Sequence, residues 1–248
     1  MKRQFLLLLV AIQFLTRLPV PVEGELPDEA LAESARYFPI VGALVGAGAI
    51  GIDLLFGSRG GRNVSVALIL IYLVVVTGGL HEDGLADAAD GFGGGWTKER
   101  VLMIMRDSNI GSYGALAIGL SLLARFAFLS NLPIASFHGV LLAAQVLNRW
   151  ATLPLAYWLP AARNKAGQGA RMAKKMSTAS LVISTACMVI IVSAACGLAA
   201  IWMIAVACGV AALTGLYYHR RIGGITGDCL GATVQITECA VYLTGVMS

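Results

Sequence analysis

The chain has 248 residues, of which 58% are apolar and only 13% are charged, and its formal net charge is +4. Ordinary globular domains carry about 25% charged residues, so this composition, with a mean hydropathy of +0.78, excludes a disordered chain, a disulfide scaffold and most soluble domains. A polytopic membrane protein is the class that remains. Because no soluble stretch of domain size separates the apolar runs, we expect one membrane-embedded, all-α domain over residues 1–248.

The first predicted element is a short apolar helix at the N-terminus. Basic residues precede its apolar run, as in a signal peptide, but no small-x-small cleavage site follows, and Arg17, Pro19 and Pro21 come directly after it. Its roughly 15 residues are marginal for crossing a hydrocarbon core of about 30 Å. We therefore expect a retained helix that is either short or interfacial.

Longer apolar runs predict the membrane bundle. They lie at 38–57, 64–80, 110–132, 138–159, 181–218 and 230–247. The fifth run is long enough for two helices of about 19 residues with a turn near Gly197. We therefore predict about seven transmembrane helices in addition to the N-terminal helix.

The positions of Lys and Arg predict the orientation of this bundle. The basic connections at 81–109, at 161–176 and after Tyr218 fall on one side when the predicted helices alternate, and that side is assigned to the cytoplasm. Arg59 and Arg62 fall on the opposite side and count against the arrangement, but they are the minority. The basic loop 161–176 binds either an anionic substrate or the anionic inner leaflet, and the lipid is the simpler explanation.

The segment 78–95 is the richest in chemistry. Four of the 14 acidic residues lie between positions 82 and 90, and Asp83, Asp87 and Asp90 are spaced i, i+4 and i+7. On a helix these three lie within about 60° of one another, where like charges repel. A bound divalent cation would relieve the repulsion, and oxygen-only ligands predict Mg²⁺; the alternative is a solvated helix end. Glu82, about 100° from Asp83, is either a supporting group or simply solvated.

Two neighbouring features offer contacts to an anion. The glycines at 91, 93, 94 and 95 predict a loop whose backbone approaches a phosphate closely, so Gly93 and Gly94 are candidate substrate contacts, although a glycine cluster also suits a plain turn. The guanidinium of Arg106 can hold a phosphate with two N–H donors, and Asp107 can either orient Arg106 or bind metal. The alternative for Arg106 and Asp107 is an ordinary surface ion pair.

A second glycine-rich turn, at 223–231, opens the last predicted helix. Such a turn presents free backbone N–H groups to an anion, and Thr226 is a candidate cap and substrate contact. Asp228 is either a further metal ligand or a first-turn acid favoured by the helix dipole. Glu238 lies deep in the apolar run, and acids inside a membrane are usually functional.

The remaining candidates are a histidine and two arginines in apolar surroundings. His81 adjoins the acids and is a candidate proton acceptor or substrate contact, or else a structural histidine. Arg125 and Arg149 sit inside predicted spans and need a partner or a polar cavity; Arg149, beside Asn148, is the better candidate for a phosphate contact. Together these residues predict an intramembrane Mg²⁺-dependent enzyme that acts on a diphosphate.

Five motifs in order along the chain closely resemble the cobalamin synthase family, the adenosylcobinamide-GDP ribazoletransferases. They are TRLPVP at 16–21, FPIVG at 38–42, TGGLHEDGLADAADG at 77–91, IMRDS at 104–108 and GGITGDCLGA at 223–232. The resemblance implies a multi-pass enzyme of the bacterial or archaeal inner membrane, with a cytoplasmic site, acting in the last steps of coenzyme B12 assembly.

The resemblance also implies the reaction and its cofactor. Family members join the cobinamide-phosphate group of adenosylcobinamide-GDP to α-ribazole or its 5'-phosphate, release GMP and require Mg²⁺. For this reaction we expect four acids to bind the metal, Arg106 to steady the diphosphate, and His81 or Asp107 to assist the nucleophile. The metal ligands are Asp83, Asp87, Asp90 and Asp228, with Asp83 also counted as catalytic. We expect no nucleic-acid partner; the acceptor, the number of metals and any homo-oligomer stay open.

Three other membrane proteins use intramembrane or clustered acids. A CDP-alcohol phosphotransferase has an arginine in its motif where Asp87 stands here, and an aromatic prenyltransferase needs two Asp-rich motifs. An ion-coupled transporter predicts acids near the bilayer midplane in two related repeats, and the sequence shows no long repeat.

Overall fold

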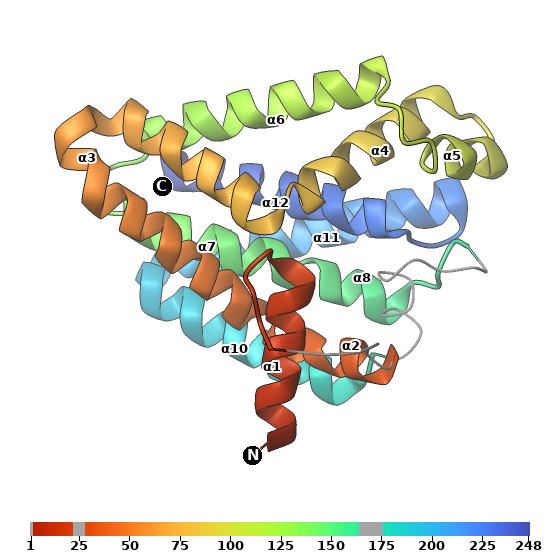
Figure 1. Ribbon diagram of the computed structural model, residues 1–248, viewed down its shortest axis with the longest axis horizontal. Coiled ribbons are helices and arrows are strands. Elements are labelled where there is room, and N and C mark those ends of the chain that lie inside the picture. Colours follow the sequence, from red (N-terminus) through yellow and green to blue (C-terminus); the bar gives the residue numbers. More distant parts are fainter. Residues whose placement is uncertain (1, 22–27, 164–175) are drawn as a thin grey trace.

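The structure is a computed structural model that describes residues 2–21, 28–163 and 176–248 (Figure 1). Within these residues the chain is helical, and its extended pairing is a single parallel bridge between Ala161 and Ile225. The predicted all-α class is therefore confirmed. The helices are α1 (Lys2–Leu15), α2 (Asp28–Ser34), η1 (Ala35–Tyr37), α3 (Phe38–Thr77), α4 (Leu80–Gly94), α5 (Lys98–Ile104), α6 (Ser112–Asn131), α7 (Phe137–Trp150), α8 (Thr152–Trp158), α10 (Thr178–Cys196), η2 (Gly197–Ala199), α11 (Ala200–Ile222) and α12 (Gly227–Met247).

Four helical stretches of the described chain are long and apolar enough to cross a membrane: Glu29–Thr77, Ser112–Asn131, Thr178–Ile222 and Gly227–Met247. The most apolar windows of the second and third are only 17% buried, whereas that of the last is 67% buried. Helix α12 is therefore central, while α6, α10 and α11 present apolar faces outward, as lipid-facing helices do. This agrees with a membrane bundle, and the number of seven spans stays a prediction.

Helix α3 contains the two runs predicted at 38–57 and 64–80. It changes direction at Gly61, whose φ of 75° is available to glycine at little cost, and Figure 1 shows its two halves diverging from this bend. The halves are tied together because Ser65 Oγ donates to Asp53 Oδ1 at 2.6 Å. His138 Nε2 of α7 lies 2.8 Å from Asp53 Oδ2, which fixes the bend to the core.

The later runs agree with the sequence except in one place. The turn predicted near Gly197 is present, with φ of 55° at that glycine between α10 and α11. The run at 138–159 forms two helices, α7 and α8, divided at Ala151. Helix α1 is short, as expected, and the Arg17 N–H that follows it donates to the Val76 carbonyl at 2.7 Å.

Two consecutive glycines separate α3 from α4. Gly78 and Gly79 have φ of 66° and 70°, left-handed values that end the first helix and allow a second to start in a new direction. The acidic segment therefore occupies a helix of its own, α4. The acidic residues predicted to share a helix do so.

Helices α4 and α12, which are far apart in the sequence, cross in close contact. A β-carbon at Gly84 would lie 3.0 Å from the Gly231 α-carbon and 3.1 Å from the Asp228 carbonyl oxygen. A β-carbon at Gly231 would likewise lie 3.0 Å from the Gly84 α-carbon. The two backbones touch, which is the reason small residues occur where membrane helices cross.

Gly84→Ala tests this crossing. The added methyl group meets backbone atoms that cannot rotate away, so we expect the free energy of unfolding to fall by about 1–3 kcal/mol and activity to fall with it. The measurement is the thermal midpoint in detergent. The control is Gly209→Ala in α11, where a β-carbon meets nothing within 4 Å. A Gly84→Ala protein that melts like the wild type would contradict the close contact.

Candidate active site

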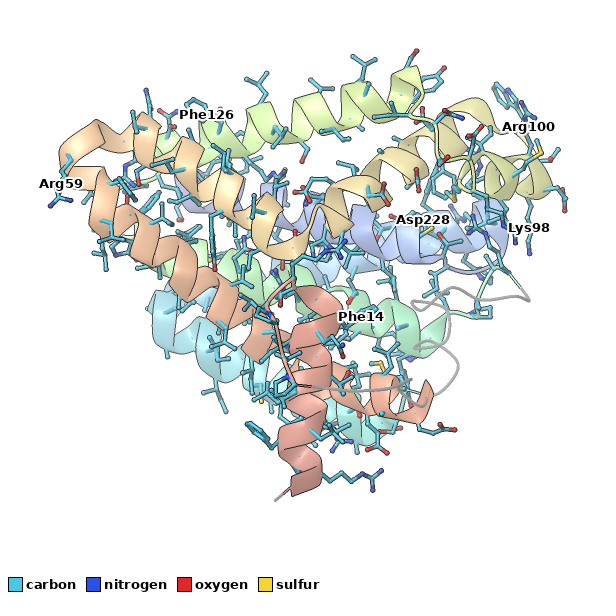
Figure 2. All side chains as sticks on the ribbon, viewed as in Figure 1. Phe14, Arg59, Lys98, Arg100, Phe126 and Asp228 are labelled. Carbon is cyan, nitrogen blue, oxygen red and sulfur yellow. The ribbon has the colours of Figure 1, made fainter. Side chains whose placement is uncertain are left out.

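Four carboxylates gather beside the crossing of α4 and α12. Asp83 is exposed, Asp87 is half-buried and Asp90 is buried on α4, while Asp228 lies in the first turn of α12. Figure 2 shows Asp228 toward the end of the molecule that carries Lys98 and Arg100, with Arg59 at the opposite end. Two segments that are far apart in the sequence thus bring all four predicted metal ligands to one region.

The carboxylates interact electrostatically. Burial, followed by the negative charges of Asp228, Asp83 and Asp90, raises the pKa of the Asp87 carboxyl to about 7, and Arg163 acts in the opposite direction. Negative charge is therefore in excess here, as the spacing predicts.

The donor set fits Mg²⁺ in chemical kind. Among the described residues no three His, Cys, Asp or Glu side chains converge as a complete metal-binding group. Mg²⁺ does not require one, since it commonly binds one or two carboxylates and completes its shell with water and substrate phosphates. Clustered oxygen donors with surplus negative charge meet that requirement.

Asp90 has a further contact that the sequence did not predict. Its Oδ2 accepts the Gly111 N–H at 2.7 Å and its Oδ1 accepts the Gly114 N–H at 2.9 Å. It thus stabilises the N-terminus of α6, where backbone N–H groups lack helical partners. A β-carbon at either glycine would collide with the Asp90 carboxylate. Asp90 therefore fastens the 105–111 turn and α6 to α4.

Arg106 and Asp107 lie exposed on that turn. The Asp107 carboxylate accepts hydrogen bonds from the Asn109 backbone N–H at 3.1 Å and from its side-chain amide at 2.7 Å. These bonds lower the pKa of Asp107. The described residues contain no ion pair between Arg106 and Asp107, so both side chains face solvent at the edge of the acidic cluster.

The prediction of a glycine-rich loop directly after the acids is wrong. Gly91, Gly93 and Gly94 belong to the last turns of α4, which ends at Gly94 and has Gly95 as its C-cap. Their missing side chains make room for neighbours: a β-carbon at Gly91 would lie 2.5 Å from Met105 Cγ, and one at Gly93 would lie 2.7 Å from the Tyr113 ring. The helical hydrogen bonding leaves these backbones less free to approach a phosphate than a loop would be.

The turn before α12 is built as the sequence predicts. Gly223 has φ of 72°, and the Thr226 hydroxyl accepts the Cys229 N–H at 3.2 Å, which makes Thr226 the N-cap of α12. The same hydroxyl donates to Asp228 Oδ2 at 3.1 Å. Thr226 thus holds the carboxylate of Asp228 beside α4.

The sequence did not single out Arg163, which lies next to this turn. Arg163 Nη2 is 3.7 Å from Asp228 Oδ2. The available signal was its place as the first basic residue of the loop 161–176, for which an anionic substrate was one of the two predicted ligands and lipid the simpler one. The rest of the charged residues of that loop lie outside the described residues.

On the inner side of α4, a network of buried charges joins three helices. Arg125 of α6 lies 3.1 Å from Glu82 Oε1 and 3.6 Å from Glu238 Oε1, so one arginine pairs with acids from both α4 and α12. Gln235 donates to Glu82 at 3.0 Å, and Asn148 donates to Glu238 at 3.0 Å. The alternative that Glu82 is solvated is wrong, because the residue is only 8% exposed.

Arg149 and His81 are also buried. Arg149 Nη1 donates to the Gln145 carbonyl, the Gln145 side chain and Asn148 at 2.9–3.0 Å, all on its own helix. Burial, then the charges of Arg149 and Arg125, lowers the pKa of His81 to about 3, so the imidazole stays neutral. Neither side chain is exposed for a substrate contact, and an imidazole of such low pKa is a weak base.

Carboxylates clustered at a helix crossing of an all-helical membrane protein form the kind of oxygen-rich site that suits a divalent metal and a phosphate substrate. Comparison with known proteins gives the family: the profile of cobalamin-5-phosphate synthase matches residues 7–246, and the chain belongs to that family. This agrees with the motifs and favours the family over the other membrane proteins considered.

Curated relatives cover nearly the whole chain. The protein named adenosylcobinamide-GDP ribazoletransferase from Shewanella amazonensis is 40% identical over 98% of this chain and 95% of its own length. The protein of the same name from Shewanella woodyi is 38% identical over 98% and 96%. No solved structure matches the chain.

The raised pKa of Asp87 predicts a pH dependence of stability. Between its ordinary pKa of 3.8 and about 7, the folded protein binds a proton that the unfolded chain has released. The free energy of unfolding therefore falls as pH rises through this window. We expect the thermal midpoint of the metal-free protein to fall as the pH rises from about 5 to 8, and to fall less steeply with pH in Asp87→Asn. Glu99→Gln, at an exposed acid on α5, is the control; an equal loss of slope there would refute the assignment.

The contact of Asp90 with α6 predicts a coupled pair of variants. Asp90→Asn is expected to lower the free energy of unfolding by about 1–2 kcal/mol, because an amide offers one oxygen to two N–H groups. Gly114→Ala should have a similar effect, and the double variant should lose less than the sum. Gly119→Ala in the same helix, where a β-carbon meets nothing within 4 Å, should melt like the wild type. Additive losses in thermal unfolding would mean that the two residues do not interact.

Proposed function

We propose that the protein is an adenosylcobinamide-GDP ribazoletransferase. It transfers the cobinamide-phosphate group of adenosylcobinamide-GDP to α-ribazole or α-ribazole 5'-phosphate and releases GMP. The observation that carries the proposal is the match to relatives of that name at 37–40% identity over nearly the full length of both chains. The cluster of carboxylates at the crossing of α4 and α12 supplies the chemistry such a reaction needs.

The reaction exchanges a phosphoanhydride bond for a phosphate ester bond. A ribose hydroxyl attacks the phosphorus nearer the cobinamide, and the bond from that phosphorus to the bridging oxygen of GMP breaks. The hydroxyl loses its proton, GMP leaves with the bridging oxygen, and a phosphodiester replaces the diphosphate. Because charge on the diphosphate opposes the attack, most of the catalysis is positioning and charge stabilisation.

The acids beside the crossing are proposed to hold Mg²⁺. The proposed ligands are Asp83, Asp87 and Asp228, whose negative charges repel one another. Asp90 adds a fourth carboxylate from its place at the N-terminus of α6. When bound, Mg²⁺ neutralises charge on the diphosphate. The surplus negative charge around Asp87 supports this assignment, since it would otherwise repel an anionic substrate.

The exposed groups at the rim are proposed to handle the substrates. Arg106 reaches solvent and is available to the diphosphate, whereas Arg149 is buried inside the bundle. Of the two residues predicted to assist the nucleophile, Asp107 is exposed and His81 is buried. We therefore assign removal of the hydroxyl proton to an exposed carboxylate at this rim.

We further propose that the protein spans the bacterial inner membrane with this site on the cytoplasmic side. The acids share one end of the molecule with Lys98 and Arg100, and α11 reaches its basic last turn, Arg220 and Arg221, close by (Figures 1 and 2). A cytoplasmic excess of Lys and Arg is the general rule for membrane helices. Soluble nucleotide substrates would reach the site from that side.

Asp83→Asn tests the proposed function. In the wild type, GMP release from adenosylcobinamide-GDP should require both the acceptor and Mg²⁺. The variant should lose about 100-fold or more of this rate, because a metal ligand matters at least as much as the groups that orient one. Its thermal midpoint should not change, since Asp83 is exposed. Glu99→Gln is the matched control; wild-type turnover in Asp83→Asn would refute the metal site.

A further inference from the structure

A short strap, residues 160–163, leads from the end of α8 to the acidic cluster. The Ile225 N–H donates to the Pro160 carbonyl at 2.9 Å, and the Ala162 N–H donates to the Ile225 carbonyl at 2.9 Å. A β-carbon at Gly224 would collide with the Pro160 carbonyl oxygen, so the strap lies directly on the turn before α12. These two backbone hydrogen bonds fix the position of the next residue, Arg163.

The guanidinium of Arg163 is held but only partly used. Its Nη2 donates to the Leu102 carbonyl of α5 at 3.1 Å. The same nitrogen lies 3.7 Å from Asp228 Oδ2, a distance for charge attraction and too long for a hydrogen bond. The Nε atom is buried and has no hydrogen-bond partner in the described structure. A guanidinium carries five N–H donors, so donors remain for a bound anion.

Arg163 is also the cation that faces the acids. Among the described residues, Arg163 is the one basic side chain within ion-pair distance of any of the four carboxylates. Two other arginines near the site, Arg125 and Arg149, also have an unpartnered Nε, but both are 1% exposed inside the bundle. Arg125 pairs there with Glu82 and Glu238, and Arg149 donates to Gln145 and Asn148. An arginine with free donors beside metal-binding acids is suited to a phosphate group, which it can contact with two parallel hydrogen bonds.

We propose that Arg163 is a substrate-binding residue that contacts the diphosphate of the nucleotide substrate. Its position on the strap, its distance of 3.7 Å from Asp228 and the carbonyl of Leu102 that holds one of its nitrogens carry this assignment. It rests on the proposed function for the identity of the substrate. The contact with a diphosphate as a chemical group does not depend on that identity.

The experiment compares Arg163→Met, Arg163→Lys and a control, Arg100→Met, on the exposed surface of α5. The first readout is binding of inorganic pyrophosphate in the presence of Mg²⁺ to the detergent-solubilised full chain. We expect Arg163→Met to weaken it about 10- to 100-fold, the usual loss for a hydrogen-bonded charged group, and Arg163→Lys to restore only part. Arg100→Met should bind like the wild type.

The second readout separates substrate contact from a structural role. A diphosphate contact raises KM for adenosylcobinamide-GDP by a similar factor and leaves both KM for the acceptor and the thermal midpoint unchanged. Wild-type pyrophosphate binding in Arg163→Met would overturn the proposal. So would full recovery in Arg163→Lys, or equal losses for both substrates with a lowered melting point, because these indicate charge balance or folding alone.

Failure of the proposed function would look different. If the wild type releases no GMP but binds pyrophosphate in a manner that depends on Arg163, the ribazoletransferase assignment is wrong and the diphosphate contact stands. If the wild type releases GMP and Arg163→Met behaves like the wild type in both readouts, the ribazoletransferase assignment stands and the diphosphate contact is wrong.

Discussion

The contact of Gly84 with Gly231 is the constraint on which the rest of the site depends. Because neither residue has a side chain, the backbones of α4 and α12 touch, and residues far apart in the sequence become neighbours. On one side of the contact Asp228 joins the acids of α4. On the other side Glu238 joins Glu82 through Arg125. One crossing thus separates the cluster of four acids, which is partly open to solvent, from a buried set of paired charges.

The rotation of α4 about its own axis is fixed at both ends. Near its start, Glu82 is drawn inward by Arg125 and Gln235, and because consecutive residues differ by about 100° on a helix, Asp83 turns outward. Near its end, Asp90 is held by the N-terminus of α6. Charges are costly inside a membrane unless they are paired, so these contacts leave little freedom for another rotation.

Local rules allowed part of this to be predicted from the sequence. The helical face of Asp83, Asp87 and Asp90, the turn at Gly197 and the cap by Thr226 follow from spacing and residue type. The helical state of Gly91 to Gly94, the burial of Glu82 and the position of Arg163 could not be predicted, because partners from distant segments decide them. Residue type alone shows that a charge needs a partner, but not which helix supplies it.

The pairing of Arg125 also has a consequence for how the protein is made. Its two acidic partners come from opposite ends of synthesis: Glu82 precedes α6 in the chain, whereas Glu238 follows it by more than a hundred residues. During translation, Arg125 of α6 therefore has one acidic partner, Glu82, in the chain already made, and translation of α12 supplies the second. Since α12 also brings Asp228, completion of the buried charge network and completion of the acidic cluster are a single late event in biogenesis.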